Sequence, residues 1–113
     1  MVTTAIGRAA EKSVADFLAA KGYKILDRNW RTRWCEIDVI AQKGKVLYFI
    51  EVKYRHVDSQ GDGFAYLTHA KLKQMRFAAD VWTESNSWRG DCRLLAASVR
   101  GNKPYQIEIV EVE

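Results

Sequence analysis

The sequence is poor in the residues that cross-link or interrupt small proteins. It contains only two cysteines, Cys35 and Cys92, and one proline in 113 residues. The cysteines lie far apart and show no CxxC or Cys/His spacing, so neither a zinc site nor a disulfide scaffold is indicated, and both are expected to be reduced packing residues. The scarcity of proline and the lack of repeats or low-complexity runs argue against long disordered segments.

Long apolar segments are also absent. No apolar run approaches about 18 residues, and the N-terminus lacks a basic region followed by an apolar stretch and a small-residue cleavage site. We therefore expect a cytoplasmic protein with no membrane partner. With 48% hydrophobic residues, the chain is long enough for one core and too short for two, so residues 1–113 are expected to form a single domain.

Positive charge exceeds negative charge. Lys and Arg total 18 against 14 Asp and Glu, which gives a net charge of +4 and a pI near 9.2. Basic groups gathered in one region would suit a polyanionic partner, whose phosphates they neutralise. A merely solvated basic surface explains the same excess, and composition does not choose between the two.

The most informative stretch is an expected β-hairpin. Residues 36–41 and 46–53 are rich in β-branched and aromatic side chains, which favours two strands joined by a turn at residues 43–44. Counting outward from this turn sets Ile37 opposite Ile50 on an apolar core face. The other face would carry the polar residues Glu36, Asp38, Glu51 and Lys53.

Three carboxylates on one face need compensation. Glu36 is expected directly across from Glu51, with Asp38 on the diagonal. At about 5 Å and an effective dielectric near 20, the repulsion is roughly 3 kcal/mol per pair, so the cluster should shift a pKa or recruit a cation. A divalent metal with oxygen ligands is one such cation, and Lys53 is a weaker remedy.

Other elements are expected on both sides of the hairpin. Residues 7–21 predict a helix that ends at Gly22, and residues 68–84 predict a second helix capped by Thr68. The buried stripe of the first helix would hold Ala10, Val14, Phe17 and Leu18. The order α-β-β-β-α-β-β predicts an α/β domain with a central mixed sheet flanked by helices, in an undetermined strand order. The remaining strands are expected at residues 23–30, 92–99 and 105–112.

Basic and aromatic residues surround the hairpin. Residues 28–34 interleave Arg and Trp, which suits phosphate contact and base stacking, although Trp30 and Trp34 are equally well explained as core residues. A polar loop at residues 57–63 is a further candidate for substrate contact. Lys71 lies near the start of the second helix, where it can point back at the sheet. The DNA-binding candidates are Arg31, Arg33, Arg55, Lys71, Lys73 and Arg76.

Metal-assisted phosphodiester hydrolysis needs such a combination of groups. The reaction requires an activated water, neutralisation of charge on the non-bridging oxygens and help for the departing oxygen. Asp38 and Glu51 would be the metal ligands, together with the backbone carbonyl of Val52. Lys53 would orient or help deprotonate the water and stabilise the pentacovalent charge. Oxygen ligands of both kinds suit Mg²⁺ or Mn²⁺.

An acid on one strand followed by Glu51-Val52-Lys53 on the next resembles the PD-(D/E)xK nuclease superfamily. More of the chain is similar to the YraN-like family of small bacterial proteins, which are predicted endonucleases related to archaeal Holliday junction resolvases. The similar segments are GRAAE at 7–11, GYKILDRNWR at 22–31, CEIDVIA at 35–41, FIEVKYR at 49–55 and THAK at 68–71. The resemblance covers residues 7–85, and Cys92 onward lies outside it.

The resemblance implies a restriction-endonuclease-like core. Its implied catalytic residues are Asp38, Glu51, Lys53 and Glu11, with Glu36 and Lys71 at further characteristic polar positions. From the residues alone, Glu11 is more simply explained as a solvated helix acid, so its site role comes from the resemblance. One departure is Cys35, because the family pattern usually has Gly there, which would permit a bulge or close backbone approach.

The leading expectation is a Mg²⁺- or Mn²⁺-dependent DNA endonuclease, acting on branched or damaged DNA in repair or recombination. Two alternatives keep the same fold: a catalytically silent nucleic-acid-binding module, and a structural or partner-binding domain. A homodimer is compatible with all three. Metal-dependent cleavage, salt-sensitive binding without turnover, and concentration-dependent association would separate them.

Overall fold

The computed structural model describes residues 4–56, 58 and 61–113. These residues form α1 (Ala5–Ala20), β1 (Lys24–Arg31), β2 (Glu36–Lys43), β3 (Val46–Arg55), α2 (His69–Ser85), β4 (Asp91–Arg100) and β5 (Gln106–Glu111). The order confirms the predicted one. Of the loop expected at 57–63 to contact substrate, residues 57, 59 and 60 lie outside the described part.

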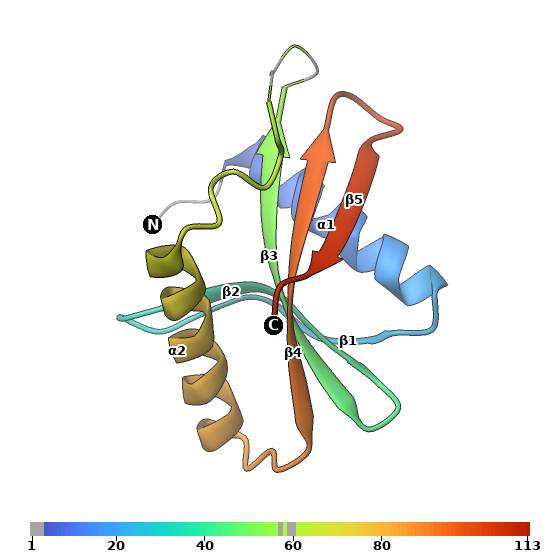
Figure 1. Ribbon diagram of the computed structural model, residues 1–113. Coiled ribbons are helices and arrows are strands. Elements are labelled where there is room, and N and C mark those ends of the chain that lie inside the picture. Colours follow the sequence, from blue (N-terminus) through green and yellow to red (C-terminus); the bar gives the residue numbers. More distant parts are fainter. Residues whose placement is uncertain (1–3, 57, 59–60) are drawn as a thin grey trace.

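The five strands form one mixed sheet in the order β1-β2-β3-β4-β5 (Figure 1). All neighbouring strands are antiparallel except β3 and β4, which are parallel. A parallel pair needs a crossover between its strands, and α2 with its flanking loops provides it. The expected α/β domain with a central mixed sheet is therefore confirmed, and it is consistent with a restriction-endonuclease-like fold.

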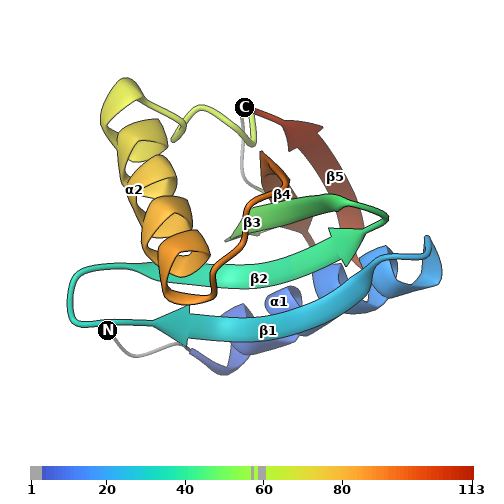
Figure 2. The same cartoon turned by 90° about the horizontal axis from the view of Figure 1, so that it is seen from below.

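The two helices lie on opposite faces of the sheet, as the view from below shows (Figure 2). On one face, Val14 and Leu18 of α1 pack with Ile50 of β3, and on the other, Trp82 of α2 packs with Phe49. Both faces of the hairpin are thus apolar over most of their length, and the expected division into one core face and one acidic face is wrong. Phe17, expected in the α1 stripe, is 36% exposed.

The hairpin register differs from the expected one by two residues. The turn consists of Gly44 and Lys45, and Val39 rather than Ile37 pairs with Ile50. Gly44 has φ 61° at the first turn position, where one common tight hairpin turn favours glycine. A slip of two residues keeps each side chain on its face but changes which acids are neighbours.

Strand alternation breaks near the start of β2. Ile37 packs on the α2 side while Val39 packs on the α1 side, although residues two apart normally share a face. On the neighbouring strand, Asn29 has a φ of 55°, and it lies between the residues of β1 that pair with Val39 and Ile37. The break therefore runs across both strands, at the position where Asp38 lies.

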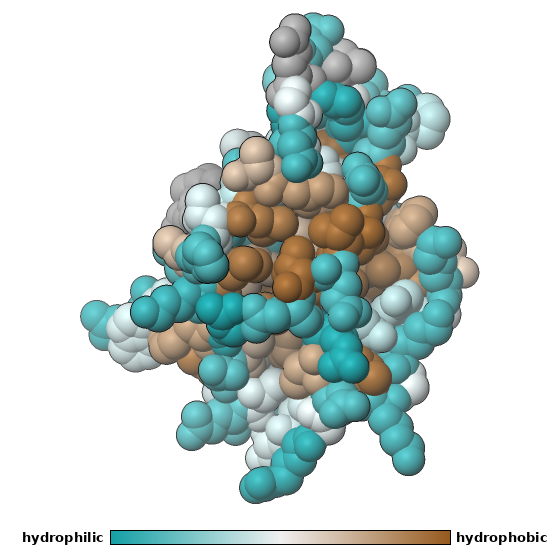
Figure 3. Space-filling view, in the orientation of Figure 1, coloured by the Kyte–Doolittle hydropathy of each residue, from teal (hydrophilic) through white to brown (hydrophobic). Residues whose placement is uncertain are grey.

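α2 covers only part of its face of the sheet. In the space-filling view, hydrophobic side chains gather at the surface beside α2, toward β5 (Figure 3).

Among the described residues, neither helix is long and apolar enough to cross a bilayer.

Candidate functional site

Asp38 lies where β2 and β3 part. Their paired residues end at Val39 and Ile50, and beyond them Asp38 Oδ2 accepts a hydrogen bond of 2.7 Å from the Val52 amide. The carboxylate thus takes the place that a backbone carbonyl would have in a continued antiparallel pair. Because the amide and carbonyl of one strand residue point to the same edge, the Val52 carbonyl also faces this gap.

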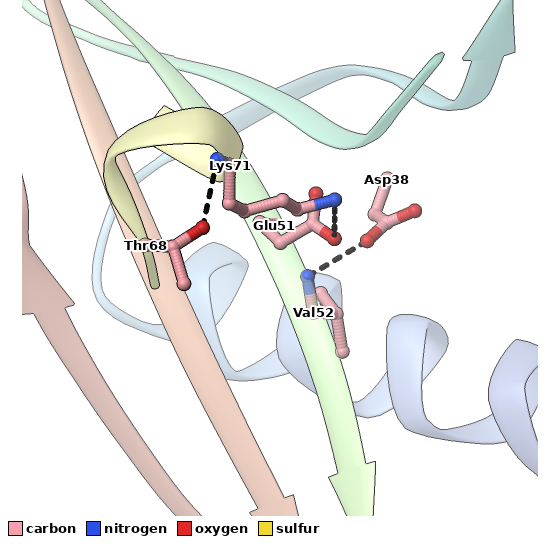
Figure 4. A network of polar contacts seen from close by, with 5 residues as sticks. All are labelled: Asp38, Glu51, Val52, Thr68 and Lys71. Atoms are coloured by element: carbon pink, nitrogen blue, oxygen red, sulfur yellow. Dashed lines mark hydrogen bonds and ion pairs between the residues drawn. The ribbon is translucent and has the colours of Figure 1, made fainter. Parts of the chain in front are cut away.

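Glu51 approaches Asp38 from β3. Its Oε1 forms an ion pair of 3.0 Å with Lys71 Nζ. Lys71 lies in the first turn of α2, where the Thr68 cap accepts a hydrogen bond from the Lys71 amide at 3.1 Å. In Figure 4, the Asp38 and Glu51 carboxylates point toward each other beside Val52, and the Lys71 ammonium lies next to Glu51. Lys71 therefore points back at the sheet, as its position predicts.

Burial, and after it the neighbouring acids, disfavours ionisation of Asp38. Burial raises the pKa of Asp38 to about 8, with repulsion from Glu51 as the second cause. The hydrogen bond from the Val52 amide lowers this pKa, and repulsion from Glu11 and Glu36 raises it further. Without an added cation, the Asp38 carboxyl therefore keeps a proton through much of the neutral range. The expected pKa shift in the acid cluster is present.

Glu11 reaches the same cluster from α1. Its side chain is buried, with 7% of the residue exposed, so its interpretation as a solvated helix acid is wrong. Burial raises the pKa of Glu11, hydrogen bonds with Asn29 and Asp38 lower it, and repulsion from Glu36 raises it. Its Oε1 atom is buried and has no hydrogen-bond partner among the described residues. This acceptor is therefore both shielded from solvent and unsatisfied among the described residues.

Lys53 and Tyr66 lie on the α2 side of β3. Lys53 is exposed, and its ammonium is 5.9 Å from the centroid of the Tyr66 ring. The Tyr66 hydroxyl is buried and lacks a hydrogen-bond partner in the described part of the chain. Burial raises the pKa of Tyr66 far above its usual range, and repulsion from Glu51 and Asp38 adds to the rise. The hydroxyl therefore stays protonated, as an unused donor beside the acids.

A groove of about 650 Å³ lies between the β1–β2 connection and the first turns of α2. Glu36 and Glu51 contribute to its lining, so the groove adjoins the acid cluster. Four of the six DNA-binding candidates also line it: Arg31, Arg33, Lys71 and Lys73.

The other two candidates are elsewhere. Arg76 forms an ion pair with Glu113. Arg55 donates a hydrogen bond of 3.3 Å to the Gly61 carbonyl, and with Arg100 it lines a smaller pocket at the far ends of β3 and β4. Four of the six basic candidates therefore line one groove. Arg76 lies one turn beyond Lys73 on α2 but outside the lining of the groove, and Arg55 lies at another pocket.

The two tryptophans of the basic segment have different environments. Trp30 is half-buried and packs with the core beneath α2, whereas Trp34 is 72% exposed and lines the groove.

Sequence reasoning missed two residues of the site, Asn29 and Tyr66. Asparagine tolerates positive φ better than most residues, which is a weak signal for Asn29, and nothing in the local pattern distinguishes Tyr66.

Cys35 fits its position without strain. Its backbone is not among the described residues with positive φ, and its amide donates a hydrogen bond of 3.2 Å to Thr32 Oγ1. A glycine is therefore not required here. Cys35 and Cys92 are both free, half-buried thiols, as expected.

The oxygen donors at the gap fit Mg²⁺ or Mn²⁺. Within the described residues, no three His, Cys, Asp or Glu side chains come close enough together to hold a metal ion. The protein ligands available for a metal at the gap are the carboxylates of Asp38 and Glu51 and the Val52 carbonyl. Mg²⁺ is commonly held by one or two carboxylates while it retains several waters. The raised pKa of Asp38 is a feature that a bound cation would relieve.

Known proteins resemble the chain over almost its whole length. Residues 10–112 match the family described as "Uncharacterised protein family UPF0102". The match continues beyond Cys92, so the expectation that this last part lies outside the resemblance is wrong. A protein from Sulfurihydrogenibium sp. is 32% identical over 109 residues, which cover 96% of this chain and 95% of the relative.

Two further relatives agree. A protein from Neisseria meningitidis serogroup C is 35% identical over 100 residues, which cover 87% of this chain and 86% of the relative. A protein from Mycolicibacterium vanbaalenii is 42% identical over 77 residues, 68% of this chain and 64% of the relative. All three relatives are named UPF0102 proteins. The chain therefore belongs to the UPF0102 family, the YraN-like group that its motifs indicate.

Proposed function

We propose that this protein is a Mg²⁺- or Mn²⁺-dependent DNA endonuclease, which hydrolyses phosphodiester bonds of branched or damaged DNA. The observation that carries the proposal is the approach of Asp38 to Glu51 at the gap between β2 and β3, with the Val52 backbone between them. A protein that only binds phosphates has no need for carboxylates that repel them. The groove that adjoins these acids supplies basic residues for the DNA backbone.

The metal would be held by Asp38, Glu51 and the Val52 carbonyl. When bound, it supplies a Lewis acid that neutralises the phosphate and favours ionised water. Lys53 lies on the same face of β3 as Glu51, because the two residues are separated by two positions. Its ammonium is exposed to an incoming phosphate, where it orients the attacking water and offsets charge on the pentacovalent phosphorus.

Two further groups support this chemistry. Glu11 lies beside Asp38, and when one of the two carboxyls carries a proton the pair shares a hydrogen bond that holds Asp38 in position. The Tyr66 hydroxyl is a buried donor without a competing partner among the described residues, and it would donate to a non-bridging phosphate oxygen once bound DNA displaces the groups that cover it.

Cleavage of a DNA panel tests the proposal. Purified wild type and Asp38→Asn are incubated with linear duplex, single strand, flap and four-way junction, with Mg²⁺, Mn²⁺ or EDTA. Wild type should cut at least one DNA only when metal is present. Asp38→Asn and Lys53→Ala should each lower the rate by on the order of 100-fold or more, because each removes charge stabilisation from the transition state.

Asp16→Asn is the matched control, because Asp16 is an exposed acid of α1 that forms a surface ion pair of 2.8 Å with Lys12. It should cut like wild type. Circular dichroism establishes that all variants are folded. Cutting by Asp38→Asn at the wild-type rate would reveal a contaminating nuclease, and no metal-dependent cutting of any DNA by wild type would refute the proposal.

A further inference from the structure

Two exposed aromatic side chains line the groove. Trp34 lies on the β1–β2 connection with 72% of its surface exposed, and Phe77 lies on α2 with 50% exposed. Single exposed hydrophobic residues are normal on protein surfaces and need no special explanation. Here, however, both belong to one groove, and that groove also contains Glu51 of the acid cluster.

The charges around these aromatic rings favour a polyanion. The groove is lined by four basic residues and two acids, which leaves an excess of two positive charges. The Arg33 guanidinium lies 5.3 Å from the centroid of the Trp34 ring, and Lys73 is on the opposing helix. Aromatic rings with basic groups beside them are the usual surface of proteins that bind single-stranded nucleic acids.

Stacking distinguishes single strands from duplexes. In a duplex, the flat faces of the bases are covered by neighbouring bases, so an exposed tryptophan has no face to stack on. In a single strand every base can offer its face, whatever its identity. Phosphate contacts from lysine and arginine are available in both forms and do not by themselves select the single strand.

We infer that this groove binds a single-stranded segment of DNA, with one unpaired base stacked on Trp34 and its phosphates on Arg33 and Lys73. The groove reaches Glu51, so a strand bound in it would lie beside the acid cluster. The inference therefore deepens the proposed function, and it rests on that function for the cutting of the strand. The substrate class is then a DNA in which an unpaired segment adjoins the site, as in a flap or an opened branch point.

Binding without cleavage tests the inference. A fluorescein-labelled oligothymidine of about 16 nucleotides, and a duplex of equal length, are titrated in EDTA with wild type, Trp34→Ala, Trp34→Phe and Phe17→Ala. The anisotropy of the label reports binding. Phe17 is the matched control, because it is an exposed aromatic residue of α1 on the other side of the sheet.

Wild type should bind the single strand more tightly than the duplex. Trp34→Ala should weaken single-strand binding by about fivefold to 100-fold, the usual effect of losing one stacked base, and should leave duplex binding unchanged. Trp34→Phe should restore most of the affinity, and Phe17→Ala should match wild type. Equal single-strand affinity of wild type and Trp34→Ala would overturn the inference, as would an equal loss of duplex binding.

A protein partner is the competing occupant. If wild type is a dimer without DNA and Trp34→Ala is a monomer by sedimentation velocity, the groove is an interface between copies, and the inference fails. The proposed function fails separately: absence of metal-dependent cutting, combined with Trp34-dependent binding of single strands, would leave a binding module. Cutting with no effect of Trp34→Ala on binding would leave an endonuclease that uses another surface.

Discussion

The Tyr66 hydroxyl is unusual because it is buried beside two carboxylates and yet makes no hydrogen bond among the described residues. A buried polar group without a partner costs roughly 1–3 kcal/mol relative to a satisfied one. The Tyr66 ring, by contrast, has a cation–π partner, because the Lys53 ammonium lies over it. The hydroxyl therefore opposes folding of the isolated protein, and a contact with substrate would explain its presence.

Tyr66→Phe should separate activity from stability. Loss of a donor to a charged oxygen should lower the cleavage rate by about tenfold to 100-fold, from roughly 1.5–3 kcal/mol per such bond. Removal of an unsatisfied buried hydroxyl should leave the free energy of unfolding unchanged or raised. Single-turnover cleavage and urea unfolding measure the two effects. Tyr105→Phe on the α1 side of the sheet is the control, and unchanged cleavage by Tyr66→Phe would assign the residue a packing role only.

Single residues were predictable where a short spacing carries the chemistry. The hairpin pattern led to the expectation that Asp38 and Glu51 lie close together, which they do, although the register and the single acidic face behind that expectation are wrong. The site role of Lys53 stays a prediction. Asn29 and Tyr66 could not be found in that way. Each lies beside a partner that is distant in sequence: Asn29 hydrogen bonds with Glu11, and Tyr66 lies near Glu51. Local periodicity contains no information on such contacts.

At the scale of elements, the start of α2 links helix stability to the site. The Thr68 hydroxyl caps the helix at the amide of Lys71, and the side chain of that same lysine pairs with Glu51. The cap therefore fixes where the helix begins and, with it, the direction in which the ammonium points. α1 has a similar cap, with Thr4 accepting from the Gly7 amide at 3.0 Å, but without a site residue in its first turn.

These two caps allow a matched comparison. Thr68→Ala and Thr4→Ala should each lower the free energy of unfolding by about 1 kcal/mol, the usual effect of an N-cap threonine. Only Thr68→Ala should also slow cleavage, because it releases the helix end that positions Lys71. Thermal melts and initial rates measure both effects. An equal change of rate in the two variants would show that the α2 cap has no special connection to the site.

The helices and strands were predictable because periodicity and turn residues mark them. The hairpin register was not, because the turn was placed one residue too early, at Lys43-Gly44 instead of Gly44-Lys45. The same pattern could not reveal that both faces of β2 and β3 are covered. Apolar side chains on both faces give a nearly continuous apolar run, and alternation then no longer identifies the solvent side.

At the scale of the whole molecule, Asp38 should make stability depend on pH. Its pKa rises from 3.8 to about 8 on folding, so the folded state holds a proton that the unfolded state loses. Its contribution to stability is full below pH 4 and decreases as pH rises toward 8. In EDTA, the free energy of unfolding of wild type should therefore fall between pH 5 and 8 relative to Asp38→Asn, whose side chain does not titrate.

Urea unfolding of both proteins at several pH values measures this difference. Added Mg²⁺ should stabilise wild type more at pH 8 than at pH 5, because protons compete with the cation for the carboxylates. Asp16→Asn should follow wild type throughout. A pH-independent difference between wild type and Asp38→Asn would contradict the raised pKa, and equal stabilisation of Asp38→Asn by Mg²⁺ would place the cation elsewhere.

The hydrogen bond that replaces the β2–β3 ladder at Val52 also has a spectroscopic consequence. The Val52 amide proton points at the Asp38 carboxylate, so its magnetic environment depends on whether that group carries a proton, a negative charge or a metal ion. A single backbone resonance in a ¹⁵N spectrum therefore follows the state of the acid cluster. The Val52 amide thus reports protonation of, or metal binding to, Asp38 without a substrate or an introduced label.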